Sequence, residues 1–229
     1  MLRRMMGPLL FGSIGVAVLV SLGVWQMQRL AWKQGVLAEI EARIGDAPVA
    51  LPETVEPERD RYLPVEATGR LGEAHVRVLV SQRGQGAGYR VISPFETEGR
   101  RVLVDRGIMP PEAEPPVHEG AVTVRGNLHW PQEVDQFTPE ADPVRNLWYA
   151  REVEALAGHL GTEPVMIIAR ELSVADAPLA PLPVDTSGIP NDHLNYAITW
   201  FSLAALWLGM TLHLLWRIRR GSLQRAQGK

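Results

Sequence analysis

Two long stretches without formal charge, one near each end of the chain, most constrain what this sequence can fold into. Residues 7–25 contain no charged residue, and residues 194–216 contain none apart from the titratable His213. A helix of about 20 apolar residues crosses the hydrocarbon core of a bilayer, which is about 30 Å thick. We therefore expect two transmembrane helices, at 7–25 and 194–216, with both chain termini on one side of the membrane.

The distribution of charge predicts which side that is. Residues 1–6 and 217–229 carry seven basic residues and no acid, whereas the segment between the spans has a net charge of −10. Basic residues near a span favour the cytoplasm. We expect two cytoplasmic tails, 1–6 and 217–229, and a periplasmic middle in a bacterial plasma membrane, because six residues before the first span leave no room for an organelle transit peptide.

The first span has an alternative interpretation as a cleaved signal peptide, with Ser21-Leu22-Gly23 as the cleavage site. Its apolar run is longer than the 7–15 residues of a usual signal core. The length therefore favours an uncleaved anchor.

Between the spans the pattern predicts a helical stalk at 26–45, a β-rich extracytoplasmic domain at 46–172 and a Pro-rich connector at 173–193. In the stalk, Leu30, Leu37, Ile40 and Ile44 recur at helical spacing. The domain combines short alternating strands with a single helix at 151–160, and Glu98-Gly99 is a hairpin signal. We expect an α+β domain dominated by an antiparallel sheet or an open barrel. The expected strands are 74–82, 88–96, 101–106, 121–128 and 164–170.

The domain offers no recognisable catalytic constellation. The sequence lacks cysteine, which excludes disulfides, Cys-x-x-Cys redox or copper sites and c-type haem attachment. It also lacks Gly-x-Ser-x-Gly and any pair of histidines at metal-ligand spacing. Gly84, Gly86 and Gly88 form a glycine cluster without the Gly-Lys-Ser/Thr of a phosphate loop, so a hairpin turn is favoured. An anchored periplasmic hydrolase is therefore disfavoured.

Some polar and aromatic groups of the domain allow a structural or a binding role. Arg106-Gly107, at the end of a strand, is typical of a turn with a surface arginine, with a ligand contact as the alternative. The acidic residues are expected to form a solvated surface. Core packing is favoured over a ligand shelf for the aromatic residues Trp130, Phe137, Trp148 and Tyr149.

The second span carries an unusual face. On an ideal helix, His193, Tyr196, Trp200, Trp207 and Thr211 fall within about 60° of one another. Interfacial anchoring explains an aromatic at the head-group level, but not tryptophans about 10 and 20 Å deeper. Neutral imidazole is a common iron ligand, and aromatic rings suit a porphyrin face, so an anchor belt and a ligand shelf both remain open. His213 lies about 30 Å along the helix from His193 and cannot share its site.

Five segments, in order along nearly the whole chain, resemble the Surfeit family of cytochrome c oxidase assembly proteins. They are LGVWQMQRLAWK (22–33), GYRVISPF (88–95), VLVDRGIMP (102–110), FTPEADPVRNLWYAR (137–151) and NDHLNYAITWFSLA (191–204). The chain departs from the family pattern at Leu71, Asp105, Ile108 and Asp192.

The resemblance implies a non-enzymatic assembly factor for the large, haem-bearing subunit of a haem-copper oxidase, which binds haem A and helps to insert it. His193 matches the family's transmembrane histidine and is the expected axial iron ligand, and Tyr196, Thr199 and Trp200 match the adjoining residues. The expected partners are that subunit, haem A synthase and membrane lipid, but not nucleic acid. The alternative is a structural scaffold that stabilises an oxidase intermediate without binding haem.

Overall fold

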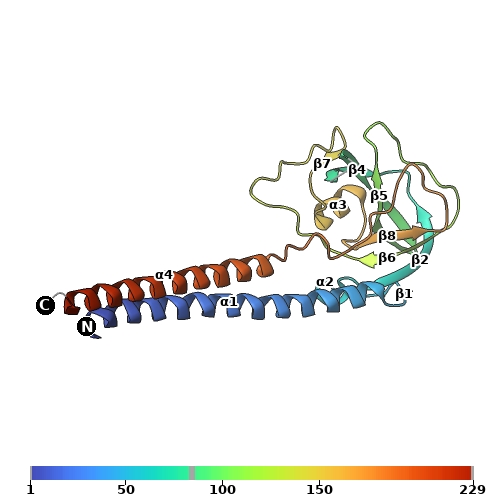
Figure 1. The fold of residues 1–229 in the computed structure, drawn as a ribbon. Helices are drawn as coiled ribbons and strands as arrows, with labels where there is room; N and C mark the ends of the chain where they lie inside the picture. The colour runs from blue at the N-terminus through green and yellow to red at the C-terminus, as the bar shows by residue number, and fades with distance from the viewer. Residues whose placement is uncertain (1, 83–85, 228–229) are drawn as a thin grey trace. The chain divides into compact units, whose positions relative to one another are not determined.

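The computed structural model describes residues 2–82 and 86–227 (Figure 1). They form two compact units, one made of α1 up to Ala38 together with the chain from Ser187, the other made of Glu39–Thr186. The elements are α1 (Leu2–Gly45), β1 (Val49–Ala50), α2 (Pro57–Asp60), β2 (Pro64–Leu71), β3 (Val76–Gln82), β4 (Gly86–Thr97), β5 (Arg100–Met109), β6 (Val122–Leu128), β7 (Leu147–Trp148), α3 (Val153–Leu160), β8 (Met166–Leu172) and α4 (His193–Gln227).

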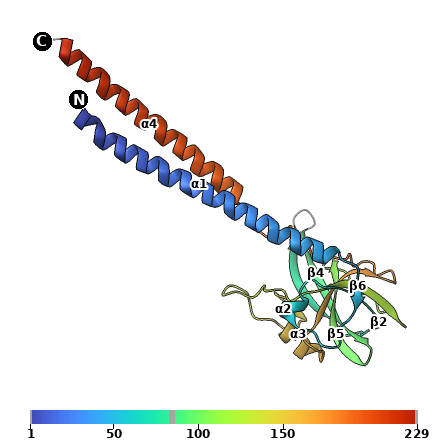
Figure 2. The ribbon, with the colours of Figure 1, turned by 90° about the horizontal axis from the view of Figure 1, so that it is seen from below.

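The first unit is a pair of long helices, α1 and α4, which lie side by side in two perpendicular views (Figures 1 and 2). Met5–Gly45 and His193–Gly221 are both long and apolar enough to cross a membrane. Few of their apolar side chains are buried by protein, since only 6% of each apolar window is buried. In water such exposure would be strongly unfavourable, so the two helices are those of a membrane protein.

The second unit is a β-barrel with a helix packed into its core. The eight strands have the order β1-β2-β6-β8-β5-β4-β3-β7, and a further pairing of β2 with β4 closes a ring of five strands, β2-β6-β8-β5-β4. The expected two apolar helices around a sheet-rich domain are thus confirmed. The sheet is mixed, however, because β8 follows the α3 crossover and lies parallel to β5 while it pairs antiparallel with β6.

The ring closes over only two residue pairs, Arg70 with Glu96 and Leu71 with Phe95. Beside them, Gly69 approaches the Glu96 carbonyl so closely that a Cβ would collide with it and with the Phe95 ring. Phe95 itself is fully buried in the barrel core. The closure therefore depends on the absence of a side chain at residue 69.

The predicted hairpin at Glu98-Gly99 is confirmed, with both residues in the left-handed region, at φ 50° and 77°, between Thr97 and Arg100 of β4 and β5. In the glycine cluster, Gly86 and Gly88 belong to β4 and pair with β3, whereas Gly84 lies outside the described residues. The helix predicted at 151–160 is α3, which begins two residues later, at Val153. It ends at Leu160, where Gly161 (φ 66°) provides a left-handed cap.

Of the four aromatic residues assigned to the core, Trp130 and Trp148 are buried there and Tyr149 is half-buried. For Phe137 the prediction is wrong, because its side chain is 80% exposed. The ring lies on the long connection between β6 and β7, where the backbone makes no strand that would carry it into the core.

Gly69→Ala is expected to lower the free energy of unfolding by about 1–3 kcal/mol, because the new methyl group overpacks the β2–β4 closure. Thermal unfolding of the detergent-solubilised full chain measures this. The control is Gly158→Ala in the exposed part of α3, where a Cβ meets nothing within 4 Å and alanine favours the helix. Equal melting temperatures for the two variants would contradict the role assigned to Gly69.

Candidate functional site

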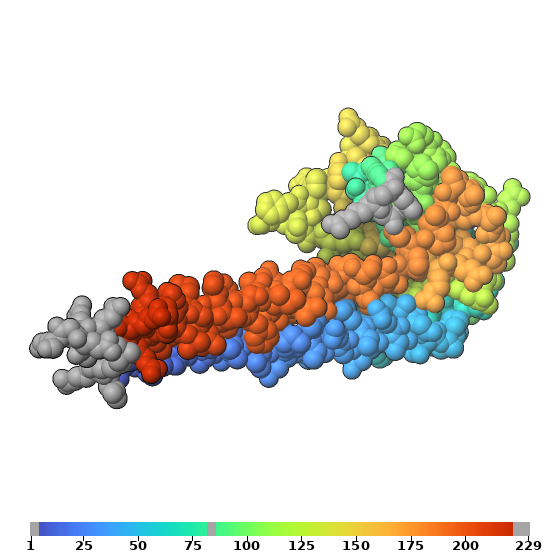
Figure 3. Space-filling model, viewed as in Figure 1, coloured from blue at the N-terminus to red at the C-terminus, as the bar shows by residue number. Residues whose placement is uncertain are grey.

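One face of α4 is packed against α1 within the helix pair. The residues of this face that are buried or half-buried recur at alternating intervals of four and three: His193, Ala197, Trp200, Ala204, Trp207 and Thr211. Such spacing puts side chains on one stripe of a helix and is the pattern of two helices crossing at a small angle. Figure 3 shows the two helices in contact along their length. We call this stripe the α4 seam.

Glycines of α1 receive the large side chains of α4. A Cβ at Gly12 would collide with Thr211, one at Gly15 with the indole of Trp207, and one at Gly23 with the ring of Phe201. Small residues allow transmembrane helices to approach closely, where dispersion contacts replace the hydrophobic driving force that lipid does not provide. The contacts advance along α1 as they retreat along α4, so the two helices are antiparallel.

A side-chain hydrogen bond joins the two helices where α4 begins. His193 Nδ1 is 2.8 Å from Gln26 Oε1, in a half-buried setting. A carbonyl oxygen only accepts hydrogen bonds, so a neutral His193 donates from Nδ1 and its Nε2 carries a lone pair. This is the arrangement by which a second residue orients an imidazole and fixes the tautomer that can bind a metal.

The four predicted site residues divide between two sides of α4. His193 and Trp200 belong to the α4 seam, whereas Tyr196 is 57% exposed and Thr199 is exposed with its hydroxyl donating to the Asn195 carbonyl. The helix therefore brings Tyr196 and Thr199 together on a flank of the seam, beside His193. Trp207 and Thr211, which share the predicted face, lie deeper on the seam itself.

Cationic groups of α1 lie one and two turns from Gln26. The guanidinium of Arg29 stacks over the Trp32 ring at 4.2 Å, and Lys33 donates to the carbonyl of Pro190, just before α4. Within the described part of the chain, no carboxylate is paired with Arg29. This end of the helix pair thus combines an imidazole, an amide and two cations.

Gln26 is the residue that sequence reasoning missed. It stands in LGVWQMQRLAWK, one of the five segments of the family resemblance, but nothing in that segment says which α4 residue it meets. The two antiparallel runs could have been aligned by placing glycines of the first opposite aromatic residues of the second. That alignment pairs residue 26 with the start of α4.

The barrel contains a second polar cluster, which is buried. Asp105 has no exposed surface and accepts hydrogen bonds from Arg90 Nε (2.8 Å) and Arg151 Nη1 (3.2 Å). Arg151 in turn pairs with Glu133 through two nitrogens. Burial acts to raise the pKa of Glu133, but the hydrogen bonds and charge of Arg151 outweigh it and keep that pKa below its usual value.

Arg106 lies in a neighbouring buried group, so the expected surface arginine is wrong. Its side chain is 3% exposed, pairs with Asp176 and donates to the Pro116 carbonyl at 2.9 Å, while His118 Nε2 lies 2.6 Å from the same carboxylate. Asp105 and Asp176 likewise depart from the solvated acidic surface expected from composition. Charges this deeply buried must be paired, and here the pairs attach irregular segments to β5.

His129 follows β6 and stacks on Tyr62, with ring centroids 5.1 Å apart. Burial, together with the nearby cations Arg151 and Arg61, lowers the pKa of His129 to about 4. The folded domain therefore holds this ring neutral under conditions in which an unfolded chain would protonate it.

Together, the two apolar helices and the intervening barrel define a membrane protein with a sheet-rich domain carried between its two spans. The profile of the SURF1 family matches residues 14–205, which include most of α1, the whole barrel and the first part of α4. The chain belongs to the SURF1 family. This family is known for cytochrome c oxidase assembly factors and is not a known class of enzymes.

Relatives from distant organisms share most of the chain. Surfeit locus protein 1 of Homo sapiens is 33% identical over 211 residues, which cover 80% of this chain and 69% of the human protein. The Xenopus tropicalis protein of the same name is 33% identical over 81% of this chain and 68% of its own length. A SURF1-like protein of Monosiga brevicollis is 31% identical over 91% of this chain and 88% of its own length.

The depressed pKa of His129 predicts a pH-dependent stability. Between an unfolded pKa near 6.5 and the folded value of about 4, the unfolded chain binds more protons, so the free energy of unfolding falls as pH decreases through this window. Because the ring is only half-buried, we expect a loss of about 1 kcal/mol between pH 7 and pH 5. His129→Gln should remove that part of the loss.

Thermal unfolding of the full chain at both pH values measures the effect. His75→Gln is the control, because His75 hydrogen-bonds only at the exposed surface. An unchanged pH dependence in His129→Gln would contradict the assignment of this histidine.

Proposed function

We propose that this chain binds haem A at the end of the helix pair that carries His193 and Gln26, and helps to insert it into the large subunit of cytochrome c oxidase. His193 is the proposed axial ligand of the haem iron, through Nε2. Tyr196, Thr199 and Trp200 are the proposed neighbours of the macrocycle. Family membership supports oxidase assembly, and the further step to haem A rests on the chemistry of this site.

The hydrogen bond between His193 and Gln26 is the observation that carries the proposal. It leaves one imidazole nitrogen with a free lone pair, as haem iron requires of a proximal ligand. A single protein ligand also suits a carrier, because a site that must surrender its cargo cannot bind it from both sides as firmly as a resident cofactor is bound.

The location of the site suits an amphiphilic cargo. Haem A carries an isoprenoid tail that belongs in hydrocarbon, and a water-soluble carrier would have to enclose it. On the surface of a two-helix membrane anchor the tail stays in an apolar environment while the iron is held near the helix end. Haem A synthase, which produces this haem, is accordingly a proposed partner besides the oxidase subunit.

We also propose the orientation. Basic residues near the N-terminal end of α1 and the C-terminal end of α4 favour the cytoplasm, so the barrel and His193 would lie on the periplasmic side of a bacterial plasma membrane. Haem A would then be held at the outer surface of that membrane, in contact with its lipid.

A second candidate function is a scaffold that stabilises an unfinished oxidase subunit through the barrel domain. It is favoured by the connection between β6 and β7, where Phe137 is 80% and Val144 97% exposed. The turn that presents Phe137 is ordered, because Asp135 Oδ1 accepts from the Phe137 amide at 2.8 Å and Thr138 Oγ1 accepts from the Asp135 amide. Exposed apolar side chains on a fixed turn are a usual form of protein contact.

Protein purified from cells that make haem A should show a haem absorption spectrum, and His193→Ala should abolish or shift it. Gln26→Met removes the acceptor of Nδ1 at similar volume and should weaken haem binding by about tenfold, as losses of such supporting residues do. His213→Ala is the matched control, since it changes a histidine of the same helix about 30 Å away. Wild type without any haem signal would falsify the proposal.

The scaffold candidate makes a separate prediction. Phe137→Ser should reduce co-purification of the large oxidase subunit by about tenfold, the effect of truncating an aromatic anchor, and leave the haem spectrum unchanged. Val117→Ser, which alters an exposed valine of another loop, is the control. Undiminished co-purification in the Phe137 variant would argue against this surface.

A further inference from the structure

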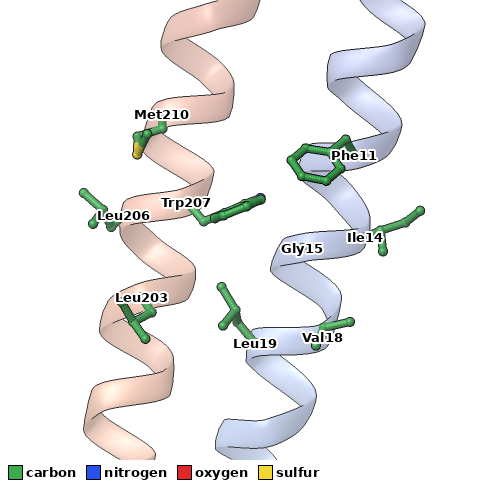
Figure 4. Close-up of a pocket in the computed structure, with 9 residues that line it drawn as sticks. All are labelled: Phe11, Ile14, Gly15, Val18, Leu19, Leu203, Leu206, Trp207 and Met210. Carbon is green, nitrogen blue, oxygen red and sulfur yellow. The ribbon is translucent and has the colours of Figure 1, made fainter.

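An apolar groove of about 430 Å³ runs between the two helices (Figure 4). Gly15 and the indole of Trp207 lie at its centre, where the missing side chain at Gly15 leaves room between the helices. Phe11 and Val18 of α1, and Leu206 and Met210 of α4, are among the residues around it. They are from 53% to 67% exposed, so the groove opens onto the surface of the helix pair.

The groove lies on the same flank of α4 as two of the proposed haem neighbours. Tyr196 and Thr199 are followed at intervals of four, three and four residues by Leu203, Leu206 and Met210. This spacing keeps all five side chains on one stripe of the helix. From His193, the groove-lining part of the stripe begins about 15 Å and ends about 25 Å along α4.

The facing stripe of α1 leads to a cation. Phe11 and Val18 line the groove, and Trp25 and Arg29 continue their stripe at intervals of seven and four residues. Arg29 stacks on Trp32 and has no carboxylate partner in the described chain. Along this flank and the adjoining seam, the helix pair therefore presents, in order, a cation, the imidazole of His193 and an uncharged groove.

This order matches an amphiphile with an anionic head and a hydrocarbon tail. Lipid could fill the groove, but a bilayer lipid has no use for the imidazole of His193, which lies on the adjoining seam one turn before this stripe begins. Haem A combines a carboxylate-bearing macrocycle, an iron that takes an imidazole, and one isoprenoid tail. Its chemistry is complementary to all three parts of the flank.

This inference rests on the function proposed above. We propose that the groove between α1 and α4 binds the isoprenoid tail of haem A, and that Arg29 pairs with the carboxylates of the macrocycle. The groove then distinguishes haem A from haems that lack a tail. His193 cannot do so, because iron is common to all of them. Selectivity for the cargo is thus assigned to Gly15, Trp207 and the walls around them.

Two haems separate the contributions of head and tail. The full chain, in lipid nanodiscs, is titrated with haem A and with protohaem, which has the carboxylates and iron but no isoprenoid tail. Wild type should bind haem A about tenfold more tightly, a moderate preference because the competing environment of the tail is itself apolar. Leu206→Phe and Val18→Phe, which narrow the groove from opposite walls, should each reduce that ratio to near one by weakening haem A alone.

The controls use the same two titrations. Leu208→Phe adds the same bulk two residues further along α4 and therefore on another side of the helix, and should leave both affinities unchanged. Arg29→Gln should weaken both haems equally, because both carry carboxylates. Protohaem binding also reports whether each variant is folded.

The outcomes distinguish this inference from the function on which it rests. Equal affinities of wild type for the two haems, or groove variants that weaken both alike or neither, would overturn the assignment of the groove and leave the His193 site standing. Failure of wild type to bind either haem would overturn the proposed function itself.

Discussion

The close antiparallel packing of α4 on glycines of α1 is the constraint on which the candidate site depends. A shift of one residue between the helices would move every contact by about 1.5 Å and rotate it by about 100°, which a hydrogen bond of 2.8 Å cannot survive. Trp207 on Gly15 and Phe201 on Gly23 fix this register far from His193. The imidazole is thus oriented by Gln26, which is 167 positions away in sequence, and neither helix alone holds the candidate site.

In the barrel, buried charged side chains attach segments without regular secondary structure to the strands. Asp105 and Arg106, consecutive residues of β5, point to opposite faces of the strand and anchor different segments. Asp105 holds Arg90, which reaches the Leu182 carbonyl, and Arg106 reaches the Pro116 carbonyl. Proline-rich segments have few donors of their own, so arginines that donate to their carbonyls attach them to the strand.

The sequence predicted the two spans, most strands and the turn at Glu98-Gly99, because each depends on local periodicity or on a two-residue signal. It also made His193, Tyr196 and Trp200 candidates, because they share one face of a predicted helix, whereas Thr199 was a candidate only through the family resemblance. It could not predict that Gln26 meets His193, or that Arg106 is buried, because both depend on partners distant in sequence. A charged residue next to a turn looks the same in sequence whether its partner is water or a buried carboxylate.

The sheet ends in two very short strands. β1 and β7, the terminal members of the strand order, have two residues each, and the five strands between β2 and β4 close on themselves. Such a domain offers an incoming polypeptide only short stretches of free backbone, chiefly the part of β3 beyond the two residues that pair with β7, and so limits the edge-to-edge association that threatens unfinished β-proteins. An assembly factor meets partners before they are complete, when their own strand edges are exposed. This barrel would meet such chains with little sheet edge to extend, and recognition of them would then fall to side chains.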